Sequence, residues 1–146
     1  MSMKFNHSGF TLIEMIMVSV IVGIMAMMAL PRFFDNSVYQ SRGFADQVQA
    51  SLRYAQKVAI AQRRFVCVAF TSNSLTLTIG STSACGTAFA MSNGAAALNA
   101  PTGIAFSTVP TNFYFNALGS PSLSQTISVN GAASSFTIEP ETGYVH

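Results

Sequence analysis

The sequence predicts an α+β fold, in which one long N-terminal helix packs on a small antiparallel β-sheet domain. Residues 10–30 form an apolar run long enough for a membrane-spanning helix, and helical periodicity then continues to about Arg64. Beyond Arg64 the apolar residues recur with a period of two. These observations divide the 146 residues into a leader (1–9), an apolar half (10–30) and an amphipathic half (31–64) of the helix, and a β-rich globular domain (65–146).

The composition favours a chain that is attached to a membrane or packed into a larger assembly. Half of the residues are hydrophobic and only 8% are charged, against roughly 25% in typical soluble domains. The formal net charge of +2 is too small to indicate a nucleic-acid partner by itself. No Asp, Glu, Lys or Arg occurs between Phe65 and Ile138, so the sheet domain is almost uncharged.

The apolar run of residues 10–30 is long enough to cross a bilayer as a helix, so the first half of the helix is predicted to be transmembrane. Its interruptions are Thr11, Glu14, Ser19 and Gly23. A secretory signal peptide is the rival interpretation, but it has a shorter apolar core and ends at a small-residue cleavage site, which this run lacks. An ionised Glu14 in a bilayer-length helix costs about 2.5 to 3.5 kcal/mol, so a compensating partner is expected nearby.

The second half of the helix begins with a proline. Pro31 cannot donate a backbone hydrogen bond and leaves the Met27 carbonyl free, which predicts a bend. Helical periodicity then resumes with opposite apolar and polar arcs. The apolar arc contains Phe44, Val48, Leu52, Ala55, Val58 and Ala59. The polar arc contains Asp46, Gln49, Arg53, Lys57 and Arg64. One helix from about Phe10 to about Arg64 would be roughly 80 Å long.

The remaining residues predict a small antiparallel sheet. Residues 65–70 and 75–79 form a hairpin around the polar turn TSNS, with Leu75, Leu77 and Ile79 on one face. The Gly/Ser/Ala-rich residues 80–103 are expected to be a long loop. Further strands are expected at residues 104–106, 113–115 and 126–129, the last followed by an Asn130-Gly131 turn and the segment SSFTIEP.

Two cysteines, Cys67 and Cys85, lie 18 positions apart. If the second half of the chain is exported, they are expected to form a disulfide, which stabilises by roughly 3 kcal/mol in the loop-closure model. Two buried thiols are the alternative. No CxxC or His-rich spacing accompanies them, so no metal site is expected.

The stretch GFTLIE at residues 9–14 resembles the class III signal of type IV pilins and type II secretion pseudopilins. Pro31 also matches a proline common in that family. The resemblance implies a pilin fold, cleavage by a prepilin peptidase between Gly9 and Phe10 on the cytoplasmic face, and methylation of the new Phe10 amine. It further implies that Glu14, with Thr11, acts in assembly, where Glu14 pairs with the Phe10 amine of a neighbouring subunit. Protonation of Glu14, or pairing with its own N-terminus, is the alternative.

The hairpin after the helix, the Gly/Ser-rich middle and the closing FTIEPETGYVH are similar to GspH/FimT-type minor pilins and pseudopilins. The early cysteines depart from common major pilins, whose cysteines bracket a C-terminal loop. The resemblance therefore implies a structural minor subunit of a type IV pilus or a type II secretion pseudopilus, with no cofactor. It implies a single pass through the bacterial inner membrane, with the globular domain in the periplasm, before the subunit enters the filament. Implied partners are membrane lipid, prepilin peptidase, the inner-membrane assembly platform and, through the N-terminal helix, other pilin or pseudopilin subunits.

Two other function classes find less support. Some FimT-type minor pilins bind DNA during uptake, and the cations Arg53, Lys57, Arg63 and Arg64 could serve this role; a solvated polar face explains them equally well. An enzyme is not expected, because the histidines are His7, in the leader, and His146, the last residue, which leaves a nucleophile without a well-placed base. Glu139 and Glu141 flank a proline and are expected to be surface charges.

Overall fold

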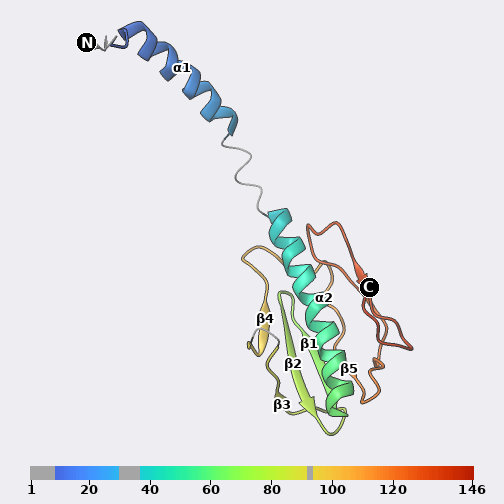
Figure 1. The fold of residues 1–146 in the computed structure, drawn as a ribbon. Helices are drawn as coiled ribbons and strands as arrows, with labels where there is room; N and C mark the ends of the chain where they lie inside the picture. The colour runs from blue at the N-terminus through green and yellow to red at the C-terminus, as the bar shows by residue number, and fades with distance from the viewer. Residues whose placement is uncertain (1–8, 30–36, 92–93) are drawn as a thin grey trace, which may run out of the picture. The chain divides into compact units, whose positions relative to one another are not determined.

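The computed structural model describes residues 9–29, 37–91 and 94–146. The chain divides into two compact units, Met1–Asn36 and Ser37–His146, and each is described by itself (Figure 1). Helix α1 belongs to the first unit, and helix α2 with all the strands belongs to the second. The predicted bend at Pro31, and the predicted continuity of the helix across residues 30–36, lie outside the described residues.

Helix α1 (Leu12–Ala29) begins at a threonine cap. The Thr11 carbonyl accepts hydrogen bonds from the Glu14 and Met15 amides at 3.1 and 3.2 Å, and the Thr11 Oγ1 lies 3.4 Å from the Glu14 nitrogen. Threonine followed three residues later by glutamate is the capping-box pattern of a helix start. Within the described ranges, no helix meets the combined length and apolarity required for a membrane span.

Helix α2 (Ser37–Gln62) is amphipathic as predicted. All six residues of the predicted apolar arc are buried, and Ser41 and Ala45 are buried beside them. On the polar arc, Asp46, Arg53 and Lys57 are exposed and Gln49 is half-buried, while Arg64 follows the end of the helix. The 3.6-residue period therefore identified the core-facing side of this helix correctly.

The main sheet is built on the predicted hairpin. Strands β1 (Phe65–Phe70) and β2 (Ser74–Gly80) pair antiparallel, with Phe65 opposite Gly80 and Phe70 opposite Leu75. Strand β5 (Phe113–Phe115) adds to the free edge of β1. Strands β3 (Thr87–Ala88) and β4 (Ala97–Asn99) both pair with β2 on its other side. The sheet order is β3-β2-β1-β5, with β4 off this path.

The prediction of an unbroken loop over residues 80–103 is wrong, because β3 and β4 lie within it. These strands have two and three residues, and Leu98 is their sole buried side chain. So short a strand in Gly/Ser/Ala-rich sequence shows no alternation, and its pairing with β2 is set by tertiary structure.

A second, smaller sheet pairs β6 (Thr126–Ile127) with β7 (Phe136–Thr137). The strand expected at 126–129 is therefore shorter, and the one expected at 104–106 is reduced to an isolated bridge between Phe106 and Val129. The predicted Asn130-Gly131 turn is present: the Ala132 amide donates to the Val129 carbonyl at 3.1 Å, and Gly131 has a φ of 78°. A positive φ at the third turn position is typical of a type II turn.

Helix α2 lies across one face of the main sheet (Figure 1), and the buried side chains of the core lie between them. Strands β1, β2 and β5 each bury every second residue. Leu75, Leu77 and Ile79 are buried as predicted. Aromatic rings extend this core: Phe106 contacts both Phe44 and Phe70, at centroid distances of 5.4 and 5.6 Å.

Cys67 and Cys85 form the predicted disulfide, with their Cα atoms 6.1 Å apart. The bond ties the middle of β1 to the loop that follows β2. Gly80, at the end of β2, leaves room for this crossing, because a Cβ atom there would lie 2.7 Å from the Cys85 Cα. The disulfide therefore fixes the loop against the sheet face opposite α2.

Candidate functional site

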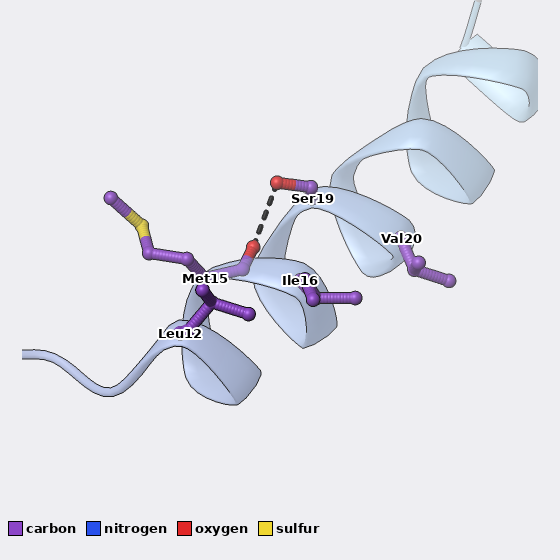
Figure 2. Close-up of a pocket in the computed structure, with 5 residues that line it drawn as sticks. All are labelled: Leu12, Met15, Ile16, Ser19 and Val20. Carbon is purple, nitrogen blue, oxygen red and sulfur yellow. Dashed lines mark hydrogen bonds between the residues drawn. The ribbon is translucent and has the colours of Figure 1, made fainter.

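The surface of α1 is apolar on all sides. Thirteen large apolar side chains between Phe10 and Met27 are 50–80% exposed in the unit taken by itself. Leu12, Met15, Ile16, Ser19 and Val20 line a shallow groove along it (Figure 2). The Ser19 hydroxyl donates a 2.7 Å hydrogen bond to the Met15 carbonyl, so this polar group is satisfied within the helix. Such a continuous apolar surface marks a membrane or assembly surface, because isolated exposure in water is unfavourable.

Glu14 is the only ionisable side chain in residues 9–29. It occupies the third helical position, directly above its Thr11 cap, where the positive end of the helix dipole favours a carboxylate. In the part of the chain that the structure describes, its carboxylate has no hydrogen bond or ion pair. The cap thus holds Glu14 at a defined position in the first turn of α1, and the carboxylate oxygens remain available to a partner.

Gly9 and Phe10, the predicted cleavage and methylation positions, precede the first helical residue. Both are exposed, Phe10 to 78%. A peptide bond outside the helix and open to solvent is accessible to a peptidase. Thr11 and Glu14 follow immediately, so these four predicted residues lie within one short segment at the start of α1.

Of the predicted basic residues, Arg53 and Lys57 lie within α2 and Arg63 and Arg64 follow it, and Arg53 has contacts that set it apart from the others. The Arg53 Nε donates a 3.0 Å hydrogen bond to the Val145 carbonyl, and its Cζ lies 6.0 Å from the centroid of the Tyr144 ring. Arg53 therefore holds the last residues of the chain against α2. Lys57, Arg63 and Arg64 are exposed. Among the described residues, the one ion pair joins Glu139 to His146 at 3.6 Å, so none of these cations has an acidic partner there.

Helix α2 ends in a Schellman motif, which the sequence did not reveal. The Arg63 amide donates to the Ile60 carbonyl at 3.3 Å, and the Arg64 amide donates to the Ala59 carbonyl at 3.1 Å. Arg63 takes the left-handed conformation, with a φ of 50°. This position is usually glycine, and glycine is the signal that sequence analysis uses to find such an end.

Of the residues considered for catalysis, Glu139 and His146 lie next to each other at the surface. The Glu139–His146 pair is solvent-exposed on both sides, at 46% and 52%, and the His146 ring stacks on Tyr144 at 5.6 Å. Glu141 is exposed, and His7 lies outside the described residues. The two glutamates therefore lie at the surface.

An amphipathic helix packed on a small antiparallel sheet, in a chain that also carries an apolar helix with one carboxylate at its start, is the arrangement of the pilin fold that the sequence predicts. The Prokaryotic N-terminal methylation motif matches residues 4–30. The type IV narrow pilus major component PilA5 of Thermus thermophilus is 39% identical over 56 residues, which are 38% of this chain. The crystal structure of the type IV minor pilin FimU of Pseudomonas aeruginosa has a similar fold, with a TM-score of 0.56 over 76% of this chain and 90% of FimU. The N-terminal part of the chain is therefore similar to type IV pilins in sequence, and the chain is similar to FimU in fold.

These likenesses differ in what they cover. The chain matches about half (48%) of the length of PilA5. The likeness to FimU, at 14% identity, concerns the fold. The methylation motif covers Gly9, Phe10, Thr11 and Glu14.

Proposed function

We propose that this chain is a structural minor subunit, a minor pilin or pseudopilin, of a type IV pilus or a type II secretion pseudopilus, and not an enzyme. A prepilin peptidase removes the leader 1–9 by cutting between Gly9 and Phe10 and methylates the Phe10 amine. The observation that carries the proposal is the start of α1, where a capped, unpaired Glu14 stands beside the cleavage position on an otherwise apolar helix.

The physical role of cleavage is to create a positive charge. The new Phe10 amine lies at the start of the apolar surface, where an unpaired ammonium and an unpaired carboxylate are both costly. Two unit charges 4 Å apart attract each other by about 4 kcal/mol at an effective dielectric constant of 20. This attraction offsets the roughly 2.5 to 3.5 kcal/mol that one of the two charges costs within a membrane helix, and more than half of the cost of both. Pairing of Glu14 with the Phe10 amine of a neighbour would therefore also set the register between subunits.

The apolar surface of α1 has a binding partner both before and after assembly. In the inner membrane it faces lipid, and in the filament the same side chains face the helices of other subunits. Moving between the two exchanges one apolar environment for another, so no state exposes the surface to water. In this proposal α1 is the membrane and assembly segment, α2 is the amphipathic segment that packs on the sheet, and the strands from β1 onward build the globular domain. The Cys67–Cys85 disulfide supports a periplasmic location of that domain, because disulfides persist in oxidising compartments.

Replacement of Glu14 tests the assembly role. Glu14→Val should leave membrane insertion intact and reduce incorporation into sheared filaments at least tenfold, because the ion pair is lost. Ser19→Val is the matched control, since it removes the next polar side chain of α1 and should incorporate normally. Glu14→Gln separates the alternatives. It should fail like Glu14→Val if a charged carboxylate is needed, whereas normal incorporation of Glu14→Gln would favour a protonated Glu14, and normal incorporation of Glu14→Val would refute the assembly role.

A second candidate function is DNA binding in a DNA-uptake filament. The observation in its favour is that Lys57 in α2, and Arg63 and Arg64 directly after it, are exposed and have no ion pair among the described residues. Arg53 contributes less, because it already holds the C-terminal residues. Binding through phosphates requires a steep loss of affinity between 50 and 200 mM salt, in a titration of the detergent-solubilised chain with fluorescent DNA. Absent or salt-independent binding would remove this candidate.

A further inference from the structure

The end of α2 and the loop that follows β5 form a small surface, which we call the Leu118 ledge. It is lined by Ile60, Arg63, Ala117 and Leu118. Leu118 is 84% exposed and Ile60 is 48% exposed, so two branched apolar side chains face solvent beside a cation. Leu118 lies in a loop, so its apolar side chain belongs to neither the buried face of a helix nor that of a strand.

The loop that carries Leu118 is held rigidly. The Asn116 side-chain Oδ1 accepts hydrogen bonds from the Leu118 and Ser120 amides at 2.9 and 3.0 Å. The Asn116 carbonyl accepts from the Gly119 amide at 2.9 Å, and the Asn116 amide donates to the Ser120 carbonyl at 3.0 Å. These bonds fix the backbone on both sides of Leu118. The leucine is therefore presented in one position before any partner arrives, which lowers the entropic cost of binding.

The same loop is locked onto α2. The Gln56 Nε2 donates to the Gly119 carbonyl at 3.2 Å. Gly119 has a φ of 86°, and a Cβ atom there would lie 2.6 Å from the Ile60 Cδ1. The backbone conformation favours glycine at this point, and a Cβ atom would also displace the end of the Ile60 side chain. Leu118 and the helix end therefore form one rigid surface.

The cation of the ledge is kept at an unfavourable backbone position. Arg63 is left-handed, with a φ of 50°, where glycine would be unstrained. The hydrogen bonds of the helix end hold Arg63 in this conformation, and strained non-glycine residues cluster at functional sites. The structure describes no ion pair of Arg63, and the uncharged stretch 65–138 supplies no carboxylate for it. Glu141 contacts the loop through its backbone carbonyl, which accepts a hydrogen bond from the Ser120 hydroxyl at 3.1 Å.

We propose that the Leu118 ledge docks a neighbouring pilin-class subunit, which presents a carboxylate to Arg63 beside an apolar pocket for Leu118. The inference rests on the proposed function and adds a contact between globular domains to the one through α1. The positive charge of Arg63 favours a partner with an acidic group, and the exposed apolar side chain of Leu118 favours a protein. A single-stranded nucleic acid would need aromatic side chains for stacking, and the ledge has none. A preorganised apolar side chain beside an arginine is a common arrangement in binding hot spots.

Site-specific photo-crosslinking in the native host tests the proposal. The probe p-benzoylphenylalanine replaces Leu118 in the full chain, intact cells are irradiated, and the adducts are identified by mass spectrometry. The matched position is Val109, which is also exposed and apolar at 52%. It lies toward the other end of β1, where Asn112 bonds to the Phe70 amide. We expect adducts to a pilin-class polypeptide, with a yield from position 118 at least tenfold above that from position 109.

The charge requirement is tested in the same assay. Arg63→Glu keeps a non-glycine residue at the strained position, so it preserves the fold, and it should lower the adduct yield from position 118 about tenfold, because it repels the carboxylate. Equal yields at positions 118 and 109, adducts only to DNA, lipid or a protein outside the pilin class, or no effect of Arg63→Glu would each overturn the proposal. If the chain is processed at Phe10 and incorporated while the ledge gives no pilin adduct, the docking inference fails and the proposed function stands. An unprocessed, unincorporated chain would overturn both.

Discussion

Substitution of Arg63 by glycine should stabilise the globular unit. A left-handed conformation costs a non-glycine residue about 1–2 kcal/mol, and Arg63 has a φ of 50°. Glycine loses roughly 0.5–1 kcal/mol more backbone entropy on folding than other residues. The side chain of Arg63 has no ion pair among the described residues, so little else is lost. The net expectation is a gain of about 0.5–1 kcal/mol, or roughly 3 °C in Tm.

Thermal unfolding of the detergent-solubilised full chain, followed by circular dichroism with the disulfide intact, measures this change. Lys57→Gly is the matched control, because it removes an equivalent positive charge from the interior of α2. It should lower stability by about 1 kcal/mol, the usual difference for glycine in a helix interior. A Tm of Arg63→Gly that is unchanged, or that falls as in Lys57→Gly, would refute the strain assigned to Arg63.

Three further changes test other contacts of the globular unit. Gly119→Ala should destabilise it by about 1–2 kcal/mol, measured by urea denaturation, because alanine at a φ of 86° is strained and meets Ile60; an unchanged midpoint would contradict the close approach. Reduction of the Cys67–Cys85 disulfide should cost roughly 3 kcal/mol in the same assay, and a midpoint insensitive to reductant would show that the bond contributes nothing. Arg53→Ala should cost about 1 kcal/mol and speed amide exchange at His146, whose amide lies next to the carbonyl that Arg53 holds; unchanged exchange would mean that Arg53 does not hold this segment.

Periodicity identified the elements that are long enough to show it. The six apolar-arc residues of α2 recur over more than four turns, and all of them are buried. The hairpin of β1 and β2 was identified because six-residue and seven-residue strands alternate around a polar turn. The Asn130-Gly131 dipeptide marked a turn for the same local reason. In each case a short, continuous stretch of the sequence contains the whole signal.

Elements that depend on distant partners were missed. Strands β3 and β4 have too few residues for a period, and they form because β2 offers a free edge. Arg53 was grouped with the other cations because its charge is visible in the sequence, whereas its bond to Val145 joins residues 92 positions apart. The sequence did not predict the positions of Leu118 and the left-handed Arg63 either, because their surroundings form only when α2 and the loop after β5 pack together.

The central claim is that cleavage creates a positive chain end for Glu14 to meet. The most direct measurement is mass spectrometry of the mature N-terminus, purified from membranes of the native host with and without its prepilin peptidase. The account predicts a chain that begins at N-methylated Phe10 when the peptidase is present and keeps residues 1–9 when it is absent. A chain that retains Gly9 in cells with an active peptidase would contradict it.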